Sequence, residues 1–426
     1  MAFIIAEIGT SHEGNLEKAR ALVDCACDAG ADAVKFQWVY AEEILHPKTG
    51  FVKLPTGNIP LYDRFKALEC PFSVYEKLRD YSEKKGVKFV CSPFGLRSLV
   101  ELLELSPYAV KIASPELNHY PLLHALADYR KNLSLSGKKT VPVILSSGVS
   151  TLTDIEKALD ILSLDSLKSA SALEAGEVSE KSETSETSET TEPRVLTKTC
   201  EASVERGVKA ANDENGGIAD LTLLHCITSY PAPESEYNLR LIENLSSIFG
   251  LPCGLSDHSL DPVLVPVLSI LCGGKMIEKH ITLSRKTSGL DDPVALEGEQ
   301  FALMVHAVHQ TEALLKRYGK ERGQKEMFSQ LSESYPMEKI QAVLGNGVKK
   351  LAPSEKENYG RTNRSLHYMK DLPAGKIIEP KDLAPLRTEK VLEPGISPEY
   401  LDLLLGKKLC RPVQDGAGVK LEDFMQ

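Results

Sequence analysis

Residues 3–8 read Phe-Ile-Ile-Ala-Glu-Ile, an apolar run interrupted only by the carboxylate of Glu7. A short run that is apolar throughout, rather than alternating with polar residues, is typical of a strand buried on both faces. Seven further runs of similar composition follow along the chain, at 33–37, 87–92, 109–113, 143–146, 221–226, 254–256 and 276–280. We interpret all eight runs as strands of one parallel sheet.

The segments between these runs have the spacing of amphipathic helices. Residues 16–26 place apolar side chains at positions i, i+3, i+6, i+7 and i+10, which is one face of a helix. Gly30, Gly86 and Gly250 stand where helix C-caps belong. Eight strand–helix repeats within residues 1–320 predict an α/β fold, a closed (β/α)8 TIM barrel. A doubly wound sheet is the alternative.

Three later segments depart from this repeat. Residues 163–200 are polar, lack aromatic side chains and repeat Ser-Glu-Thr three times within 182–190, which predicts a disordered insertion in the barrel. Residues 321–350 are polar with scattered glycine and lysine, and we expect a linker there. From 351 to 426, proline and glycine punctuate short segments, which predicts a separate small domain.

The composition is that of a soluble globular protein, with 42% hydrophobic and 26% charged residues and a formal net charge of −10. No block rich in Lys and Arg occurs, which disfavours nucleic acid as a partner. No run of 18 apolar residues occurs, and the N-terminus has no basic region, so we expect neither a membrane span nor a signal peptide. Nine cysteines without a Cys-x-x-Cys pair favour reduced thiols and a cytoplasmic location.

Each predicted strand ends in polar residues that are capable of chemistry. In a (β/α)8 barrel the C-terminal ends of the strands form the active-site mouth. These ends carry Glu7, Lys35, Gln37, Ser92, Lys111, Ser114, Glu116, Ser146, Thr228, Ser256, His258, Glu278 and His280. Two ammonium groups beside several hydroxyls can hold a phosphate and a carboxylate, which predicts an anionic substrate. The alternative is that Lys35 and Lys111 extend past the strand ends into solvent.

Two histidines, His258 and His280, end consecutive strands. Neighbouring strands lie about 4.8 Å apart, so their imidazoles can share one cation. Two histidines with open coordination positions suit a divalent ion such as Mn²⁺ or Mg²⁺. The alternative is that each histidine is a hydrogen-bonded structural residue, and His225 is a weaker third candidate ligand.

The same residues lie in motifs that resemble the sialic acid synthase family. The motifs span the whole barrel in order: IAEIG at 5–9, SHEGN at 11–15, AGADAVKFQ at 29–37, SPF at 92–94, KIASPE at 111–116, LHC at 224–226, SYP at 229–231, GLSDHS at 254–259 and IEKH at 277–280. RSL at 364–366 and DLPAG at 371–375 resemble the antifreeze-like SAF domain that these synthases carry.

This resemblance implies a transferase of sialic acid biosynthesis that condenses phosphoenolpyruvate with an N-acylated hexosamine, with N-acetylmannosamine as the expected sugar. It implies a phosphoenolpyruvate site formed by Lys35, Ser92, Lys111, Ser114, Ser146, Thr228 and Ser256. It implies a sugar site formed by Gln37, Tyr230, Asp291 and Arg364. Glu7, Glu116, Lys35 and Lys111 would be catalytic, and Glu7, Glu116 or both would transfer protons. His258 and His280 would hold the metal ion that polarises the sugar aldehyde.

The resemblance also implies a homodimer with exchanged SAF domains. In the family the SAF domain lies over the barrel of the partner subunit, where its arginine contacts the acyl group of the sugar. Arg364 is therefore expected to act in trans.

Several positions depart from the family pattern. Thr228 stands where many members carry Asn, Pro115 where many carry Gly, and Leu290 where Pro is more usual. These departures leave the hexosamine open, so a pseudaminic or legionaminic acid synthase is the alternative. A non-catalytic sugar-binding protein with a SAF domain is a further alternative from another class.

Overall fold

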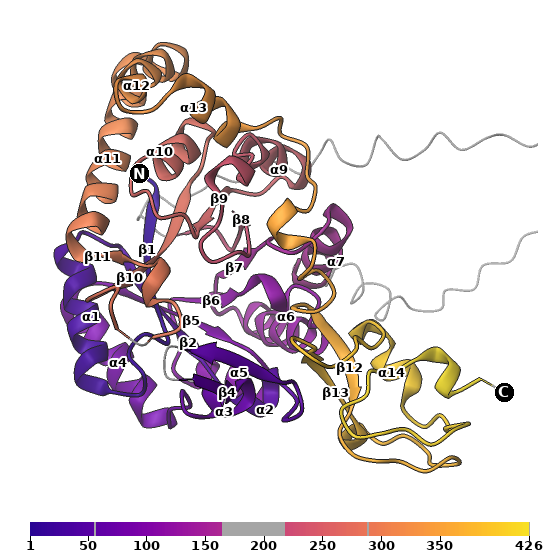
Figure 1. Ribbon diagram of the computed structural model, residues 1–426. Coiled ribbons are helices and arrows are strands. Elements are labelled where there is room, and N and C mark those ends of the chain that lie inside the picture. Colours follow the sequence, from indigo (N-terminus) through magenta and orange to yellow (C-terminus); the bar gives the residue numbers. More distant parts are fainter. Residues whose placement is uncertain (55–56, 164–217, 288, 426) are drawn as a thin grey trace, which may run out of the picture.

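The computed structural model describes residues 1–54, 57–163, 218–287 and 289–425. Eight parallel strands, each within two residues of its expected position, form one sheet: β1 (Phe3–Gly9), β2 (Ala33–Trp38), β5 (Lys88–Pro93), β6 (Ala109–Ile112), β7 (Val143–Ser146), β8 (Leu221–Cys226), β9 (Cys253–Asp257) and β10 (Met276–Thr282). They pair in chain order, and β10 pairs back onto β1, which closes the barrel (Figure 1). The predicted TIM barrel is confirmed, and the doubly wound alternative is wrong.

A helix follows each barrel strand along the chain. These helices are α1 (Leu16–Asp28), α4 (Phe72–Lys85), α5 (Leu96–Glu104), α6 (Tyr120–Leu135), α7 (Leu152–Leu162), α9 (Leu241–Phe249), α10 (Leu264–Leu271) and α11 (Gly298–Tyr318). Asn15 caps α1 by accepting a hydrogen bond from the Lys18 backbone N–H. Gly86 and Gly250 end α4 and α9 in the left-handed conformation, as expected of C-cap glycines.

The interior of the barrel consists of two layers, one apolar and one polar. Side chains of a strand point inward at every second residue, so the inward positions of each strand can be read in pairs. The lower, apolar layer includes Ile5, Ala33, Val90, Ala109, Ile144, Leu224 and Met276. Two residues further along the same strands come Glu7, Lys35, Ser92, Lys111, Ser146, Cys226 and Glu278. The apolar layer fills the barrel, and the polar layer forms the floor of its mouth.

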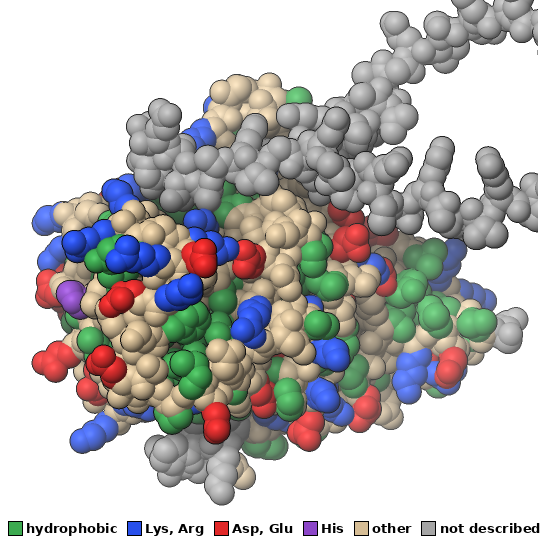
Figure 2. Space-filling view, turned by 90° about the horizontal axis from the view of Figure 1, so that it is seen from above, with side chains coloured by type: hydrophobic (Ala, Val, Ile, Leu, Met, Phe, Trp, Pro, Cys, Tyr) green, Lys and Arg blue, Asp and Glu red, His purple; other side chains and the backbone are tan. Residues whose placement is uncertain are grey.

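Residues 321–350 are not the linker that their polar composition predicted. They contain α12 (Lys320–Ser334) and α13 (Met337–Leu344), which pack on the barrel through Met327, Leu331, Ile340 and Val343. The prediction missed these helices because their apolar stripe is narrow and their outer faces are charged. Figure 2 looks onto the end formed by α11 and α12, where basic and acidic side chains are interspersed.

The C-terminal part is a small domain with its own core. Its strands β12 (Arg364–Tyr368) and β13 (Leu383–Arg387) pair antiparallel, and the short helix α14 (Leu401–Leu404) lies beside them (Figure 1). Eight buried residues form the core: Leu366, Tyr368, Leu372, Ile378, Leu383, Leu404, Leu409 and Val419. The predicted separate small domain is thus present, and residues 345–363 connect it to α13.

Two further segments complete the description. Residues 39–71 between β2 and α4 hold the helices α2 (Ala41–Ile44) and α3 (Leu61–Lys66) and the hairpin of β3 (Phe51–Leu54) and β4 (Gly57–Pro60). The short strand β11 (Leu296–Glu297) pairs with the end of β10. Nearly all of the predicted insertion, 163–200, lies outside the described residues. Within the described ranges, no helix is both long enough and apolar enough to cross a bilayer.

Candidate active site

Two buried lysines meet at one carboxylate in the mouth of the barrel. The ammonium of Lys111 lies 3.2 Å from Glu278 Oε1, and that of Lys35 lies 3.7 Å from the same atom and 2.8 Å from Glu7 Oε2. Both lysine side chains are almost fully buried, so the alternative that they extend into solvent is wrong. Burial lowers the pKa of Lys111, although Glu278 opposes the shift. Burial alone would raise the pKa of Glu278, but Lys111 and Lys35 outweigh it and lower that pKa.

Hydroxyl groups surround this charged cluster. Ser256 donates a hydrogen bond to Glu278 Oε1 at 3.1 Å, and Lys35 donates one to Ser92 at 3.4 Å. The hydroxyls of Ser146 and Thr228 are buried yet make no hydrogen bond to any described residue. Buried polar groups are normally hydrogen-bonded, so unpaired ones at the mouth of a barrel indicate a place for a polar ligand.

A glycine keeps part of this site open. Gly148 follows β7 and donates its backbone N–H to Ser114 Oγ at 3.0 Å. A Cβ atom at Gly148 would collide with the hydroxyl of Thr228 and lie 2.8 Å from that of Ser114. A larger residue at position 148, in the loop after β7, would therefore displace the hydroxyls of Ser114 and Thr228. These hydroxyls come from the loops after β6 and β8, and only glycine leaves room for both. The residues predicted for phosphoenolpyruvate thus lie at the C-terminal ends of six strands that are consecutive in the barrel: β2, β5, β6, β7, β8 and β9.

Two of the four residues predicted for the sugar, Gln37 and Asp291, converge near Gly9. A Cβ atom at Gly9 would lie 3.1 Å from Gln37 Nε2, 3.2 Å from Glu7 Oε1 and 3.4 Å from Asp291 Oδ2. Gln37 donates a hydrogen bond to Glu7 at 2.8 Å. Burial raises the pKa of Asp291. These side chains form a polar wall beside the lysine cluster, with Glu7 common to both.

His258 and His280 stand side by side next to that wall. Their ring centroids are 5.6 Å apart, and the ring of Tyr230 lies 4.2 Å from that of His258. His258 Nδ1 bonds the Ile227 carbonyl at 2.7 Å, which leaves Nε2 as its free nitrogen. His280 Nδ1 is buried without a hydrogen bond to any described residue and lies 3.8 Å from Asp291 Oδ2.

This arrangement fits a metal ion with two protein ligands and open positions. Burial lowers the pKa of His280 to about 3, so its imidazole is neutral at physiological pH, as a metal ligand must be. Among the described residues, no group of three or more His, Cys, Asp and Glu side chains forms a ready-made metal cage. A metal here would complete its coordination with water or substrate, as catalytic sites do.

His225, the third candidate ligand, does not belong to this group. It alternates with the inward-facing Leu224 and Cys226 and therefore points out of the barrel. Its Nε2 contacts the Tyr237 carbonyl at 2.5 Å. The expectation for His225 is thus wrong, and the two-residue period of the strand is the reason.

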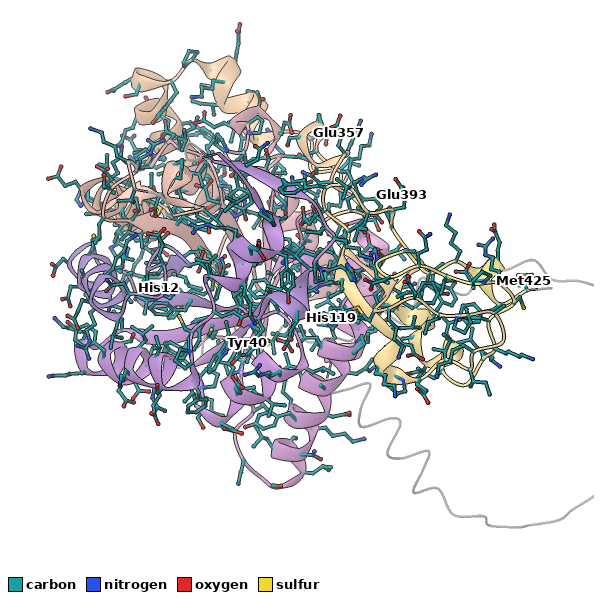
Figure 3. All side chains as sticks on the ribbon, turned by 60° about the horizontal axis from the view of Figure 1, so that its bottom comes forward. His12, Tyr40, His119, Glu357, Glu393 and Met425 are labelled. Atoms are coloured by element: carbon teal, nitrogen blue, oxygen red, sulfur yellow. The ribbon has the colours of Figure 1, made fainter. Side chains whose placement is uncertain are left out.

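Glu116 is held by two arginines of the small domain. Its carboxylate contacts Arg364 Nε at 2.5 Å and Arg387 Nη2 at 2.6 Å, one arginine on each oxygen. Glu116 and Arg364 are fully buried. Burial alone would raise the pKa of Glu116, but Arg364 and Arg387 outweigh it and hold that pKa below its usual range. Figure 3 labels the neighbouring His119, which lies beside the strands of the small domain.

Arg364 makes these contacts within its own chain. Its guanidinium also donates to the carbonyls of Glu43 at 2.5 Å and Phe94 at 2.7 Å, and its backbone pairs with the Asn118 side chain. Within this single chain Arg364 contacts its own barrel, and its action in trans stays a prediction. An exchange of the small domains between two chains stays a prediction, because a swapped domain forms the same contacts across two chains.

The connection at 345–363 contributes two charged side chains to the rim of the mouth. Glu355 accepts hydrogen bonds from the backbone N–H groups of Val149 and Thr228, both at 2.8 Å. Lys349 donates to the carbonyl of Ser147 at 2.8 Å. These contacts tie the connection to the loops after β7 and β8, the second of which carries Thr228.

The sequence missed several residues of this site. Glu278 was noted as a strand-end residue but received no role, although it faces inward with His280 by the period of two. No sequence pattern predicts a place in the site for Arg387, Lys349 or Glu355. Each lies in a segment without apolar periodicity and reaches the barrel only through tertiary contacts.

Comparison with known proteins identifies the family. The NeuB family model matches residues 22–320, and the SAF domain model matches residues 363–425. The chain belongs to the NeuB family. The first match covers the barrel from within α1 to the end of α11, and the second covers the small domain from β12 onward, which we hereafter call the SAF domain.

Several of its relatives are named as synthases of nonulosonic acids. The N,N'-diacetyllegionaminic acid synthase of Campylobacter jejuni is 27% identical over 95% of this chain and 94% of the relative. The human N-acetylneuraminate-9-phosphate synthase is 25% identical over 97% of this chain and 90% of the relative. The structure of the spore coat polysaccharide biosynthesis protein SpsE of Bacillus subtilis is similar over 100% of this chain and 95% of that chain, with 26% identity and a TM-score of 0.71. This NeuB family member is therefore an enzyme of the nonulosonic acid synthase class.

Proposed function

We propose that this enzyme joins phosphoenolpyruvate to the aldehyde of an open-chain N-acylated hexosamine, forming a nonulosonic acid and releasing phosphate. The observation that carries the proposal is the meeting of the Lys35 and Lys111 ammonium groups at Glu278. Taking charges out of water costs several kcal/mol per ion, so such a cluster is weak evidence for a stabilising role. Its position beside unpaired hydroxyls supports a multiply charged substrate instead.

The chemistry assigns one group of residues to each reactant. Lys35, Lys111 and the hydroxyls hold the phosphate and carboxylate of phosphoenolpyruvate, while Gln37 and Asp291 orient the sugar. C3 of phosphoenolpyruvate attacks the aldehyde carbon and forms the new C–C bond. Water then adds to C2, and phosphate leaves with cleavage of its C–O bond. The aldehyde oxygen must gain a proton and the water must lose one, which requires an acid/base group.

Glu7 fits the acid/base role better than Glu116 does. Glu7 lies between Lys35 and Gln37, where the two reactants meet. Both oxygens of Glu116 are held by arginines, and its lowered pKa keeps it ionised at neutral pH. We therefore assign proton transfer to Glu7 and docking of the SAF domain to Glu116.

His258 and His280 are proposed to hold a divalent cation, Mn²⁺ or Mg²⁺. Such an ion, when bound, supplies Lewis acidity that polarises the aldehyde of the sugar. The two histidines would bind and orient it, and the ring of Tyr230, itself half exposed, lies against that of His258. Asp291, close to His280, can orient the sugar next to the ion.

The decisive assay is release of phosphate from phosphoenolpyruvate in the presence of Mn²⁺ and a panel of hexosamines. We expect turnover with N-acetylmannosamine, and its abolition by excess chelator with recovery on adding Mn²⁺ or Mg²⁺. Turnover only with N-acylated diamino hexoses would support the legionaminic or pseudaminic alternative. The 6-phosphate of N-acetylmannosamine belongs in the panel, since three added carbons turn C6 of a hexosamine into C9 of the product.

The same assay tests the non-catalytic alternative. A sugar-binding protein would bind the hexosamine in calorimetry and release no phosphate with any member of the panel. Full activity in excess chelator, or in the His258→Ala/His280→Ala variant, would contradict the metal site but leave the condensation in place.

We also propose a homodimer with exchanged SAF domains, acting in the cytoplasm. The free thiols of the eight described cysteines support a reducing compartment. The connection at 345–363 has no helix or strand longer than the three-residue turn at Pro353–Glu355, which supports its ability to cross between subunits.

Mixing two inactive variants tests the exchange. Arg364→Ala has an intact barrel, and Lys111→Ala has an intact SAF domain. If Arg364 acts in trans, a mixed dimer contains one complete site, and free exchange of subunits should restore up to about a quarter of the sites. Mass spectrometry verifies that mixed dimers form. Mixed dimers without any recovered activity would show that Arg364 acts within its own subunit.

A further inference from the structure

A buried ion pair joins the two strands that carry the histidines, on the face away from the mouth. Lys279 Nζ lies 2.6 Å from Asp257 Oδ2, and both side chains are fully buried between the barrel and its helices. The two residues are register partners on β10 and β9. They alternate with His258, Glu278 and His280, which face inward. No step of the proposed reaction uses this pair.

The remaining hydrogen bonds of the pair converge on the residues around His258. Lys279 donates to the Ser259 carbonyl at 2.6 Å and to its hydroxyl at 3.2 Å. Asp257 Oδ1 accepts from the Ser259 backbone N–H at 2.8 Å. The same atom accepts from the Tyr237 hydroxyl at 2.7 Å.

Tyr237 links this network to the histidine itself. Its hydroxyl accepts a hydrogen bond from the His258 backbone N–H at 2.7 Å. Hydrogen bonds of the network therefore fix residues 257, 258 and 259. On the other strand, Lys279 of the network immediately precedes His280. The network thus connects the backbone of one histidine to the strand of the other.

Stability alone is a poor explanation for such a pair. Replacing a buried ion pair by well-packed apolar residues is often neutral or stabilising. The presence of both charges here therefore suggests that the pair maintains a specific geometry. The geometry that this network controls is the separation of the two imidazoles, whose ring centroids are 5.6 Å apart. Partners that orient a metal ligand commonly change metal affinity by 10- to 100-fold when they are removed.

We infer that Lys279, Asp257 and Tyr237 position His258 relative to His280 and thereby set the affinity for the divalent ion. They are positioning residues, because they touch neither the substrates nor the ion. This inference rests on the proposed metal site.

The test is a Mn²⁺ titration without substrates, followed by electron paramagnetic resonance of the free ion. Tyr237→Phe removes only the hydroxyl, and we expect its dissociation constant for Mn²⁺ to rise about 10- to 100-fold. Tyr368→Phe is the matched control. Tyr368 is equally buried, and its hydroxyl donates to the carboxylate of Asp423 within the SAF domain, away from the histidines. Its affinity for Mn²⁺ should stay within twofold of wild type.

A second variant keeps the inference testable if the first variant does not fold. Lys279→Met/Asp257→Leu replaces both charges by apolar side chains, so no unpaired charge remains buried. It should fold, as judged by circular dichroism, and bind Mn²⁺ at least tenfold more weakly. Phosphoenolpyruvate binding without metal should be unchanged in both variants, because the side chains of its described donors make no hydrogen bond to the network.

The outcomes separate the two proposals. Wild-type protein that binds no Mn²⁺ would overturn the metal site itself. Wild-type binding with unchanged affinity in both network variants would overturn the positioning role alone. An equal loss of Mn²⁺ and phosphoenolpyruvate binding would also overturn it, since that result indicates general distortion of the barrel.

Discussion

Replacement of Lys111 by alanine is expected to weaken phosphoenolpyruvate binding by roughly 30- to 1,000-fold, or about 2–4 kcal/mol. The ammonium lies in a buried site at 3.2 Å from Glu278, where a phosphate or carboxylate can share its protons. Without it, Lys35 alone must balance the buried Glu278 and the incoming substrate. Binding of the hexosamine should change far less, because its proposed ligands lie around Gly9. Calorimetry with each substrate separately measures the two effects.

Lys88→Ala is the matched control for this prediction. Lys88 begins β5, at the opposite end of the barrel, and its side chain is exposed. It should bind phosphoenolpyruvate like wild type. An unchanged affinity in Lys111→Ala would contradict the placement of phosphoenolpyruvate on the lysine pair, whereas an equal loss for both substrates would indicate a collapsed mouth.

Glu116→Gln is expected to release the SAF domain from the barrel. The neutral amide leaves the guanidinium of Arg364 buried without its counter-charge, next to Arg387. Breaking a buried ion pair by removing one partner costs about 3–5 kcal/mol. We expect an early unfolding transition in denaturant and faster proteolysis of the connection at 345–363. Activity should fall as well, because Arg364 is placed by this contact.

The matched control is another ion pair of the same interface. Glu399 lies on the exposed rim, 2.9 Å from Lys157, so Glu399→Gln should cost less than about 1 kcal/mol. A docking stability of Glu116→Gln equal to that of Glu399→Gln would contradict the anchoring role. Loss of activity with unchanged docking would instead indicate that Glu116 takes part in the reaction.

The pH dependence of docking follows from the same carboxylate. The folded-state pKa of Glu116 is lower than its ordinary value of 4.5, so the folded protein binds fewer protons at this carboxylate than the unfolded protein does. The contribution of the Glu116 carboxylate to the stability of the docked SAF domain is fully present above pH 4.5. It is lost as the pH falls from there through the lowered folded-state pKa. Glu116→Gln should lack this acid-dependent component.

The sequence predicted the barrel and most of the mouth because both are encoded locally. A strand buried on both faces is a continuous apolar run wherever it occurs, and eight such runs give the repeat. The polar layer follows from the period of two, since Lys35 comes two residues after Ala33 and Lys111 two residues after Ala109. The same period of two places Glu278 inward and His225 outward.

The resemblance to a family placed residues that local pattern could not. Gln37, Tyr230 and Asp291 were expected beside the sugar, and the structure brings Gln37 and Asp291 together with Glu7 around Gly9. Nothing in the spacing of these residues indicates that they meet, because Gln37 lies in β2, Tyr230 follows β8 and Asp291 follows β10. The resemblance did not place Arg387 or Glu355, which the structure shows at the mouth.

By itself, the sequence determined the eight-stranded barrel, the ring of polar residues at its C-terminal end and the presence of a second domain. Only the tertiary structure decided the partners of Glu116 and of Lys279. Glu116 meets Arg364 across 248 residues of chain, and Lys279 turns away from the mouth to meet Asp257. Local periodicity reports which face of an element is buried, since burial acts on each residue separately. The partner of a buried charge depends on the docking of distant elements, which no local period encodes.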